Sequence, residues 1–224
     1  MVKLFVLSII FTVMQQLFIN NFKKAVLLTG ITALLLLIAV FIVGKNNLFL
    51  LLNNNFGTIA DWFFKYWTYM GDGIIFIPVL FLFIIYRKKY ISLLVATFVI
   101  STILTHLFKD LLIPHEPRPI KGIADISQIH TVPGVELHSW GSFPSGHTTT
   151  AFTIFLVGTL FINKKWMLPV GFLLALLVGY SRIYLAQHFP TDIAGGMFAA
   201  ILTLYFSLAL QQWWEKRKAQ PKFD

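Results

Sequence analysis

The sequence contains no cysteine and few charged residues. Only 12% of its 224 residues are charged and 9 of them are acidic, whereas soluble domains carry about 25% charged residues. The absence of cysteine excludes disulfide frameworks and thiolate metal sites. The scarcity of charge, with 57% hydrophobic residues and a mean hydropathy of +0.76, excludes an ordinary soluble domain and indicates a membrane protein.

The excess of positive charge fits a membrane protein as well. The formal net charge is +9. No basic stripe is interleaved with aromatic residues in the manner of a nucleic-acid-binding surface, so we expect no nucleic-acid partner. Basic residues that flank membrane spans contact anionic headgroups instead. The bilayer is therefore the expected partner of this charge.

Apolar runs predict an all-α, polytopic fold. A membrane helix needs about 20 mostly apolar residues, and the length suits one domain. We predict a bundle of six transmembrane helices over residues 23–214, followed by a basic cytoplasmic tail at 215–224. The expected spans are 25–43, 69–86, 90–108, 145–162, 166–180 and 191–213.

The first 22 residues allow several interpretations. Residues 4–13 are apolar and follow Lys3, as in a signal peptide, but no small-x-small cleavage site follows them. The preferred interpretation is an amphipathic helix over residues 1–22 that lies along the membrane interface. An additional span is the alternative.

Basic residues cluster in alternate predicted connections. With six spans, all these clusters lie on one side, which the positive-inside rule makes cytoplasmic. We therefore expect both termini in the cytoplasm of a cell with a bacterial inner membrane, and the opposite face toward the periplasm or exterior. The clustered residues are Lys23, Lys24, Arg87, Lys88, Lys89, Lys164, Lys165, Lys216, Arg217, Lys218 and Lys222.

Three polar stretches lie at the predicted outer ends of the spans, over residues 109–119, 142–148 and 181–192. They supply Lys109, Arg118 and Arg182, and three cations around one point match a phosphate dianion. The second stretch contains Ser145-Gly146-His147 where a helix begins. Free backbone N–H groups and the helix dipole favour an anion there, and glycine lets the backbone approach it.

Two histidines in these stretches suit different chemical roles. His188 and Asp192 are four residues apart, so the carboxylate can bind one ring nitrogen and leave the other as a nucleophile. Attack on phosphorus would give a covalent phosphoenzyme. His147 has no carboxylate close in sequence and suits a general acid, and afterwards a base that activates water.

The three stretches resemble the signature of the type-2 phosphatidic acid phosphatase family, which also includes vanadium haloperoxidases and glucose-6-phosphatase. The family pattern is Lys-x6-Arg-Pro, then Pro-Ser-Gly-His, then Ser-Arg-x5-His-x3-Asp. The second part occurs at 144–147 and the third at 181–192. In the first part, eight residues rather than six separate Lys109 from Arg118. The resemblance covers residues 109–192 and extends to the six-span core.

The resemblance implies a lipid phosphatase that needs no metal or cofactor. His188 would be the nucleophile, Asp192 its orienting partner and His147 the acid. The expected substrates are undecaprenyl pyrophosphate, phosphatidylglycerol phosphate, phosphatidic acid and lipid A phosphates, and the small chain favours undecaprenyl pyrophosphate or a related lipid phosphate. Phosphate would be bound by Lys109, Arg118, Ser145, Gly146 and Arg182.

Other interpretations are kept beside this one. A lipid phosphotransferase would use the same phosphoenzyme, and a non-catalytic binding protein or transporter would use the same pocket. A zinc site could be drawn from His115, His130 and His138 with nearby carboxylates, although their spacing fits no recognised ligand pattern. His106 is expected to be a core histidine. The 35-residue stretch 109–143 is expected to cover the pocket and help choose the headgroup.

Overall fold

The computed structural model describes residues 2–162 and 164–219, with side chains from 20 to 217, and its regular elements in these ranges are all helical. The all-α prediction is therefore confirmed for this part of the chain. The longer helices are α1 (Val2–Val43), α2 (Lys45–Leu52), α3 (Thr58–Trp67), α4 (Phe76–Tyr86), α5 (Ile91–His106), α7 (Gly146–Phe161), α8 (Met167–Tyr184) and α9 (Pro190–Ala219). The short ones are η1 (Thr68–Gly71), η2 (Gly73–Ile75), η3 (Lys88–Tyr90), η4 (Leu107–Leu112), α6 (Pro119–Gly122) and η5 (Ile126–Gln128).

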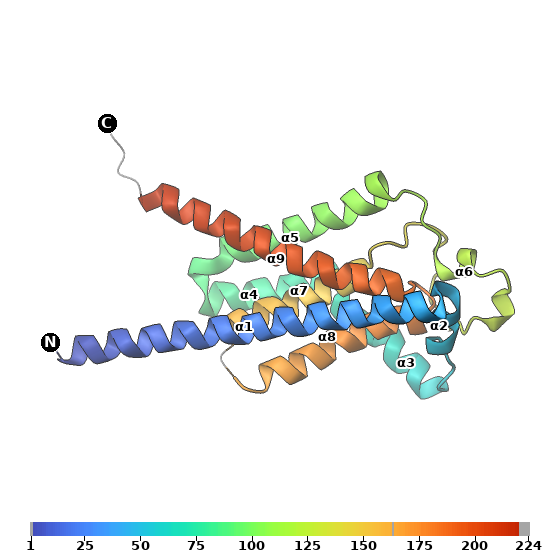
Figure 1. Ribbon diagram of the computed structural model, residues 1–224, viewed down its shortest axis with the longest axis horizontal. Helices are drawn as coiled ribbons and strands as arrows, with labels where there is room; N and C mark the ends of the chain where they lie inside the picture. The colour runs from blue at the N-terminus through green and yellow to red at the C-terminus, as the bar shows by residue number, and fades with distance from the viewer. Residues whose placement is uncertain (1, 163, 220–224) are drawn as a thin grey trace.

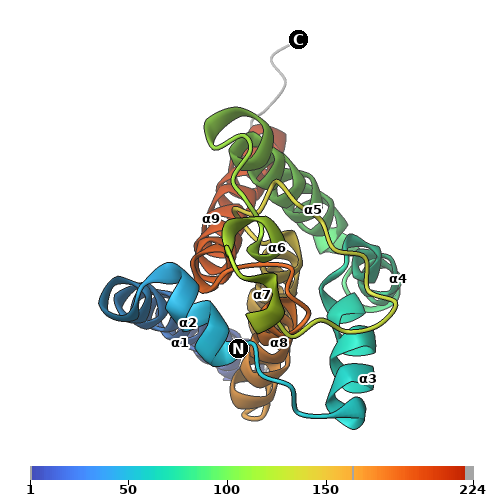
Figure 2. The ribbon, with the colours of Figure 1, turned by 90° about the vertical axis from the view of Figure 1, so that its right-hand side faces the viewer.

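Helix α7 forms the centre of the bundle. It packs against α9, α8, α1 and α5, and the end-on view in Figure 2 shows it surrounded by them. Its side chains Phe152, Phe155 and Leu156 are almost completely buried. The core of the domain therefore forms around the helix that begins with Ser145-Gly146-His147.

Within the described residues, four helices are long and apolar enough to cross a membrane: Asn20–Val43, Lys88–Leu112, Met167–Tyr184 and Pro190–Arg217. A fifth candidate is the pair Thr58–Gly71 and Gly73–Tyr86, which is bent by 59° at its break. The chain is thus a polytopic membrane protein with four to five candidate spans. The remaining predicted span, 145–162, corresponds to α7, whose 16 residues measure about 24 Å, short of a hydrocarbon core of about 30 Å.

The break in the fifth candidate span falls at Asp72. This residue leaves the helical conformation, and its carboxylate accepts a hydrogen bond from the backbone N–H of Ile74 at 3.0 Å. Because an aspartate in this position caps the next helical turn, the chain restarts as η2 and α4 in a new direction. The expected span 69–86 therefore begins inside a bend rather than in a straight helix.

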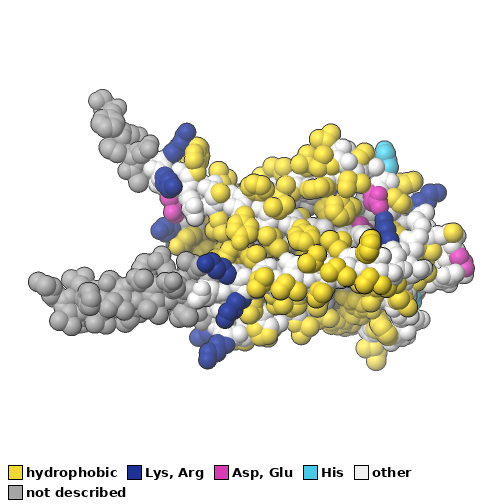
Figure 3. Space-filling view, viewed as in Figure 1, with side chains coloured by type: hydrophobic (Ala, Val, Ile, Leu, Met, Phe, Trp, Pro, Cys, Tyr) yellow, Lys and Arg dark blue, Asp and Glu magenta, His cyan; other side chains and the backbone are white. Residues whose placement is uncertain are grey.

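The two ends of the bundle differ in charge. Figure 3 shows Lys and Arg side chains gathered at the end where α9 finishes, and a hydrophobic band between this end and the other. At the opposite end α7 and α9 begin, α8 finishes, and the connection between η4 and α7 crosses the bundle (Figure 1). The predicted outer stretches therefore lie together at one end.

The segment 1–22 is part of α1, whose backbone runs as one helix from Val2 to Val43. Figure 1 shows its first turns extending beyond the other helices. The side chains before Asn20 lie outside the described residues. The assignment of residues 1–22 to the membrane interface stays a prediction.

Candidate active site

His188 and Asp192 lie in the turn between α8 and α9 and its first helical residues, and both are buried. His188 is 2% exposed and Asp192 is 1% exposed. The His188 Nδ1 lies 3.5 Å from the Asp192 Oδ2, which is longer than a normal hydrogen bond. The predicted pair is therefore in contact, with Nδ1 on the side of the carboxylate and Nε2 on the other side of the ring.

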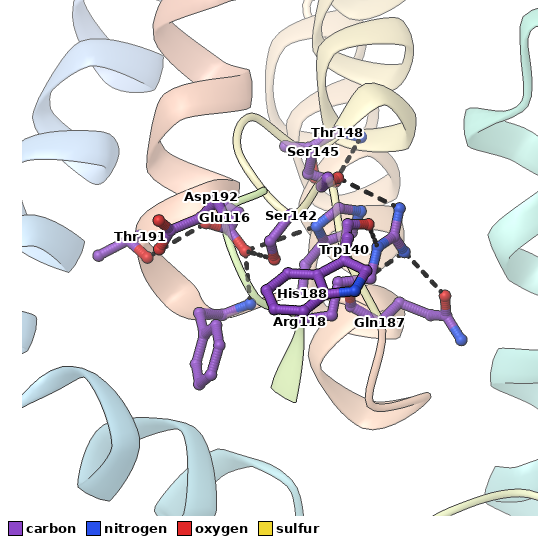
Figure 4. Close-up of polar contacts among 12 residues, drawn as sticks. Glu116, Arg118, Trp140, Ser142, Ser145, Thr148, Gln187, His188, Thr191 and Asp192 are labelled. Carbon is purple, nitrogen blue, oxygen red and sulfur yellow. Dashed lines mark hydrogen bonds and ion pairs between the residues drawn. The ribbon is translucent and has the colours of Figure 1, made fainter. Parts of the chain in front are cut away.

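The carboxylate of Asp192 is held by groups that the sequence analysis did not single out. Its Oδ2 accepts hydrogen bonds from the Ser142 hydroxyl at 2.5 Å and from the Phe189 backbone N–H at 2.8 Å. Its Oδ1 accepts a longer one from the Thr191 hydroxyl at 3.3 Å. Figure 4 shows Ser142 and Thr191 around this carboxylate. These donors fix Asp192 beside the imidazole.

The surroundings of His188 favour its neutral, nucleophilic form. Its pKa is held well below the ordinary value, first because of burial and then because of the positive charges of Arg118, Arg182 and Lys109. A contact with the Ser142 backbone opposes this shift. A neutral imidazole has the free lone pair that attack on phosphorus requires. All three predicted cations are therefore close enough to His188 to lower its pKa.

Arg118 is fixed by the segments on either side of it. Its Nε donates to the Trp140 carbonyl at 3.0 Å, and its Nη1 donates to Gln187 Oε1 at 3.0 Å (Figure 4). Burial lowers the pKa of the guanidinium, and the charge of Asp192 raises it. An arginine stays charged under such conditions, so the site keeps a fixed cation next to the His188–Asp192 pair.

Arg182 at the end of α8 carries a donor without a partner. It is 7% exposed, and its Nη1 donates to the Thr68 hydroxyl at 2.7 Å. Its Nε is buried and has no hydrogen-bond partner among the described residues. A buried donor left unpaired costs about 1–3 kcal/mol. An anion bound in the site would remove this cost, because it would accept from the guanidinium.

Ser145 caps α7 and keeps a proton available. Its Oγ accepts from the Thr148 hydroxyl at 2.9 Å and from the Thr148 backbone N–H at 3.4 Å, and its backbone N–H donates to the Asp192 carbonyl at 3.0 Å. Because the Oγ accepts both contacts, its own proton can be donated to a phosphate oxygen. A Cβ added to Gly146 would meet only ordinary contacts. Packing alone therefore does not require a glycine at position 146. The remaining explanation is the predicted one, that glycine lets the backbone approach a bound anion closely.

Lys109 and His147 line one cavity of about 230 Å³. Lys109 lies in the π-helical turn η4, and both side chains are only partly buried. His147 also lies within electrostatic range of His188, Arg118 and Arg182. The eight-residue spacing thus still brings Lys109 to the site. The π-helical turn and the left-handed backbone of His115, at φ 64°, take up the extra length.

The structure brings all eight predicted site residues to one end of the bundle and adds three more. Ser142 and Gln187 were within the polar stretches, and their proximity to the motifs was the only available signal. Thr68 lies 114 residues from Arg182 in sequence, and no sequence pattern connects them. Each of the three acts on a charged group: Ser142 on Asp192, Gln187 on Arg118 and Thr68 on Arg182.

The other histidines have different surroundings. His130 is paired with Asp61, with the Nε2 and Oδ1 atoms 2.9 Å apart. His106 was expected in the core, but it is exposed at the mouth of the cavity and paired with Asp110 at 3.0 Å. Across the described part of the chain, no three His, Asp or Glu side chains form a group that could hold a metal ion. The zinc interpretation has no support in this arrangement.

The connection that carries Arg118 and Ser142 is tied down at several points. Glu116 pairs with Lys45 at 2.5 Å, and Lys65 donates to the Pro133 carbonyl at 2.9 Å. The Asn53 side chain accepts from the His130 N–H at 2.7 Å and donates to the Ile183 carbonyl at 2.9 Å. The connection is therefore a fixed part of the site and supplies Arg118 and Ser142 to it, and its expected role as a cover stays a prediction.

Fold and site together describe a polytopic membrane protein with a buried histidine beside three cations. The sequence profile of the PAP2 superfamily matches residues 89–216, and the chain belongs to this superfamily. The superfamily includes metal-independent lipid phosphatases, and this chain is an enzyme of that class. The match includes all eight predicted site residues.

Known proteins of this superfamily resemble the chain over different lengths. Undecaprenyl-diphosphatase BcrC of Bacillus subtilis is 38% identical over 94 residues, which are 41% of this chain and 43% of that protein. The undecaprenyl-diphosphatase of Sulfolobus acidocaldarius is 28% identical over 166 residues, 73% of this chain and 77% of that one. The match thus spans less than half of BcrC and about three quarters of the archaeal protein.

Two solved structures share the fold. The structure of Aquifex aeolicus LpxE is 33% identical, with a TM-score of 0.62, and the match covers 72% of this chain and 93% of that one. The PAP2-type phosphatidylglycerolphosphate phosphatase of Bacillus subtilis is 22% identical with a TM-score of 0.58, over 89% of this chain and 98% of that one. The second likeness supports the fold alone.

Proposed function

We propose that the chain hydrolyses a phosphomonoester or pyrophosphate on a lipid headgroup at the outer leaflet, through a phosphohistidine intermediate. The candidate substrates are undecaprenyl pyrophosphate, phosphatidylglycerol phosphate, phosphatidic acid and a lipid A phosphate. The observation that carries the proposal is the surroundings of His188. A buried, neutral imidazole faces three cations, and one of them, Arg182, has a buried donor without a partner.

The first half of the reaction forms a phosphoenzyme. The Nδ1 of His188 is on the side of Asp192, so Nε2 attacks phosphorus while the bond from phosphorus to the leaving oxygen breaks. His147 takes up a proton when the bound phosphate dianion offsets the surrounding positive charges, and it donates this proton to that oxygen. Arg118, Arg182 and Lys109, with the N–H of Gly146 and the hydroxyl of Ser145, stabilise the charge on the non-reacting oxygens.

The second half returns the free enzyme. His147, now neutral, takes a proton from water as the water oxygen attacks phosphorus, and the bond to His188 breaks with release of inorganic phosphate. Asp192 stabilises the positive charge that develops on the His188 ring during each transfer. Ser142 and the Phe189 N–H keep this carboxylate in place at both steps.

The lipid tail has a route that does not cross the aqueous face. The cavity beside His147 shares Gly73 and Phe98 with an apolar groove of about 310 Å³ between α4 and α5. That groove is lined by Ile77, Leu80 and Leu94, among others. Because the covering connection is tied down on the other side, we infer that the substrate enters sideways from the bilayer with its tail in this groove.

The location of the site follows from the charge of the two ends. The Lys and Arg residues gathered at the far end favour the cytoplasm for that end. The termini would then be cytoplasmic, and the site would face the periplasm or exterior of a bacterial inner membrane. This orientation places the site at the depth of the outer headgroups.

A lipid panel with purified protein tests the proposal. Phosphate release should continue in EDTA and should fall to background in His188→Ala. His138→Ala is the matched control, because that histidine is exposed and lies outside the site. With p-nitrophenyl phosphate, His147→Ala should accumulate an acid-labile phosphoenzyme, since the good leaving group needs no acid while the attack of water needs a base.

Several outcomes would contradict the proposal. Full turnover of His188→Ala would remove histidine as the nucleophile. Phosphate release that appears only as transfer to an added acceptor lipid would replace the hydrolase by a lipid phosphotransferase. Lipid binding without any turnover would support the non-catalytic interpretation instead.

A further inference from the structure

The cavity beside His147 continues along one face of α5 in a definite order of side chains. From the outer end inward, this face presents Lys109, Thr105, the pair Ser101 and Thr102, and then Phe98. The intervals of three or four residues place them in one row. The row then continues with Leu94 and Val95 into the apolar groove. A substrate lying along it meets first a cation, then hydroxyls and then a hydrophobic surface.

Three of the hydroxyls in this cavity have little to offer an anion. Ser101 and Thr102 both donate to the Phe98 carbonyl, at 2.8 and 3.0 Å, and Thr149 donates to the Ser145 carbonyl at 3.0 Å. A hydroxyl has one proton and two lone pairs. Because each proton is already donated to the backbone, these three oxygens can only accept hydrogen bonds from a ligand.

Asp72 adds a carboxylate to the same wall. It lines the cavity opposite α5, and one of its oxygens accepts from the Ile74 N–H at 3.0 Å. Its charge also interacts with Arg182. An ionised carboxylate accepts hydrogen bonds and donates none. The middle of the cavity therefore offers four acceptors from Asp72, Ser101, Thr102 and Thr149.

The basic side chains Lys109 and His106 lie away from this middle section, whereas the hydroxyls of Thr105 and Thr150, which also line the cavity, can both donate and accept. Lys109 lies at the end of the row beside His147, where the transferred phosphate is proposed to bind. His106 lies at the exposed mouth, and its Nδ1 is 3.0 Å from the Asp110 carboxylate. The section from Thr105 to Ser101 covers four residues, which is about 6 Å along the helix axis.

We infer that this section binds a hydroxyl-bearing headgroup between the transferred phosphate and the lipid tail. The inference rests on the proposed phosphatase function. The chemical class is a phosphomonoester carried by a polyol or sugar on a lipid. Its free hydroxyls donate to Asp72, Ser101, Thr102 and Thr149. The second phosphate of a lipid pyrophosphate would place acceptor oxygens and negative charge against the same four acceptors.

The experiment compares four lipids in matched detergent micelles. They are phosphatidylglycerol phosphate, a phosphorylated lipid A disaccharide, phosphatidic acid without a hydroxylated spacer, and undecaprenyl pyrophosphate. The wild-type protein should hydrolyse at least one of the two hydroxylated substrates with a kcat/KM about tenfold above that of the pyrophosphate. The faster of the two identifies the source as a polyol or a sugar lipid.

Two variants test the residues. Thr102→Val and Asp72→Asn should each lower kcat/KM for the hydroxylated substrate about three- to tenfold, the effect of one lost hydrogen bond. Asparagine keeps the bond from Ile74, and removal of the charge should leave pyrophosphate hydrolysis equal or faster. Thr97→Val is the matched control, because that hydroxyl also donates to its own helix, at 2.7 Å, but is fully buried away from the cavity.

The ratio of the kcat/KM values for two substrates separates an effect on specificity from a general structural effect. If Asp72 only positioned Arg182, Asp72→Asn would lower the rates for all four lipids equally, and that result would overturn the inference. A pyrophosphate hydrolysed as fast as both hydroxylated lipids would also overturn it, with the phosphatase function intact. Loss of hydrolysis toward every lipid and toward p-nitrophenyl phosphate in the wild type would reject both proposals.

Discussion

The two histidines of the site lie in contrasting surroundings. His188 is 2% exposed, and the groups around it are held by Ser142, Gln187 and Thr68. His147 faces an open cavity together with Lys109. The buried half fixes the proposed nucleophile and two arginines before substrate arrives, as preorganised catalysis requires. The open half is free to differ between lipids, so we expect mutations in the buried half to affect all substrates and mutations in the open half to discriminate among them.

Arg182→Lys should give the largest loss among these comparisons. Lysine cannot donate to Thr68 and, through a second fixed nitrogen, to phosphate at the same time. We expect kcat/KM to fall about 100-fold or more for every substrate, as when one oxyanion donor is removed. Steady-state kinetics with a lipid and with p-nitrophenyl phosphate measure this loss. Arg87→Lys, at the opposite end of the bundle, is the control and should change neither rate. If Arg182→Lys lowered the rate for one substrate only, that result would contradict the division of the site into two halves.

Ser142→Ala should give an intermediate loss. It removes the 2.5 Å hydrogen bond to Asp192 and leaves a buried carboxylate oxygen with one donor fewer. We expect kcat to fall about tenfold, because an unsatisfied buried acceptor costs about 1–3 kcal/mol, with little change in KM. Ser127→Ala in the exposed part of the connection is the control. An unchanged kcat would show that Asp192 does not need this donor.

Gly71→Ala tests how much catalysis depends on the close packing of His147, in the open half, against Gly71. A Cβ at this position would lie 2.5 Å from the Val178 Cγ1, 2.7 Å from the His147 carbonyl oxygen and 3.0 Å from the His147 Cβ. The start of α7 must therefore shift, and we expect kcat to fall about threefold to tenfold, as for a displaced catalytic group worth about 1 kcal/mol. Gly30→Ala is the control, because its nearest neighbour would be an ordinary contact at 3.9 Å. Equal activity of the two variants would show that His147 tolerates displacement.

The smallest effect concerns pH and stability. The pKa of His188 in the folded protein is well below its ordinary value, so the unfolded chain binds this proton more readily. Its contribution to stability is therefore complete above the unfolded pKa of about 6.5 and is lost as the pH falls below it. The thermal midpoint in detergent should drop from pH 7 to pH 5, and His188→Asn should drop less. An equal drop in both proteins would assign the pH dependence to other groups.

A test of the prediction that the stretch 109–143 selects the headgroup has to leave the buried half of the site intact. The stretch carries both Arg118 and Ser142, so its replacement by a short loop would remove parts of the buried half. A test that keeps residues 116–118 and 140–142 and exchanges only the part around His130 would separate an effect of covering the pocket from an effect of losing site residues. The tie between His130 and Asp61 marks where that part is attached.

Much of the site could be predicted from the sequence because its chemistry is concentrated in short stretches. Ser145, Gly146 and His147 are consecutive, and His188 and Asp192 are one helical turn apart, so local spacing already relates them. Thr68 and Arg182 meet across 114 residues, and the two side chains share no period or motif. The hydroxyl row on α5 was also missed, since Ser and Thr in an apolar segment have no pattern that separates a cavity wall from a packed interface.

The sequence by itself determined that the chain enters a membrane and which charged residues and histidines form the candidate site, because hydropathy and motif spacing are local properties. The tertiary structure alone decided that α7 becomes the buried centre, that the chain bends at Asp72, and that Ser142 rather than His188 donates to the Asp192 carboxylate. These outcomes depend on packing between segments far apart in the chain, and the energy of such contacts is set only when the helices come together.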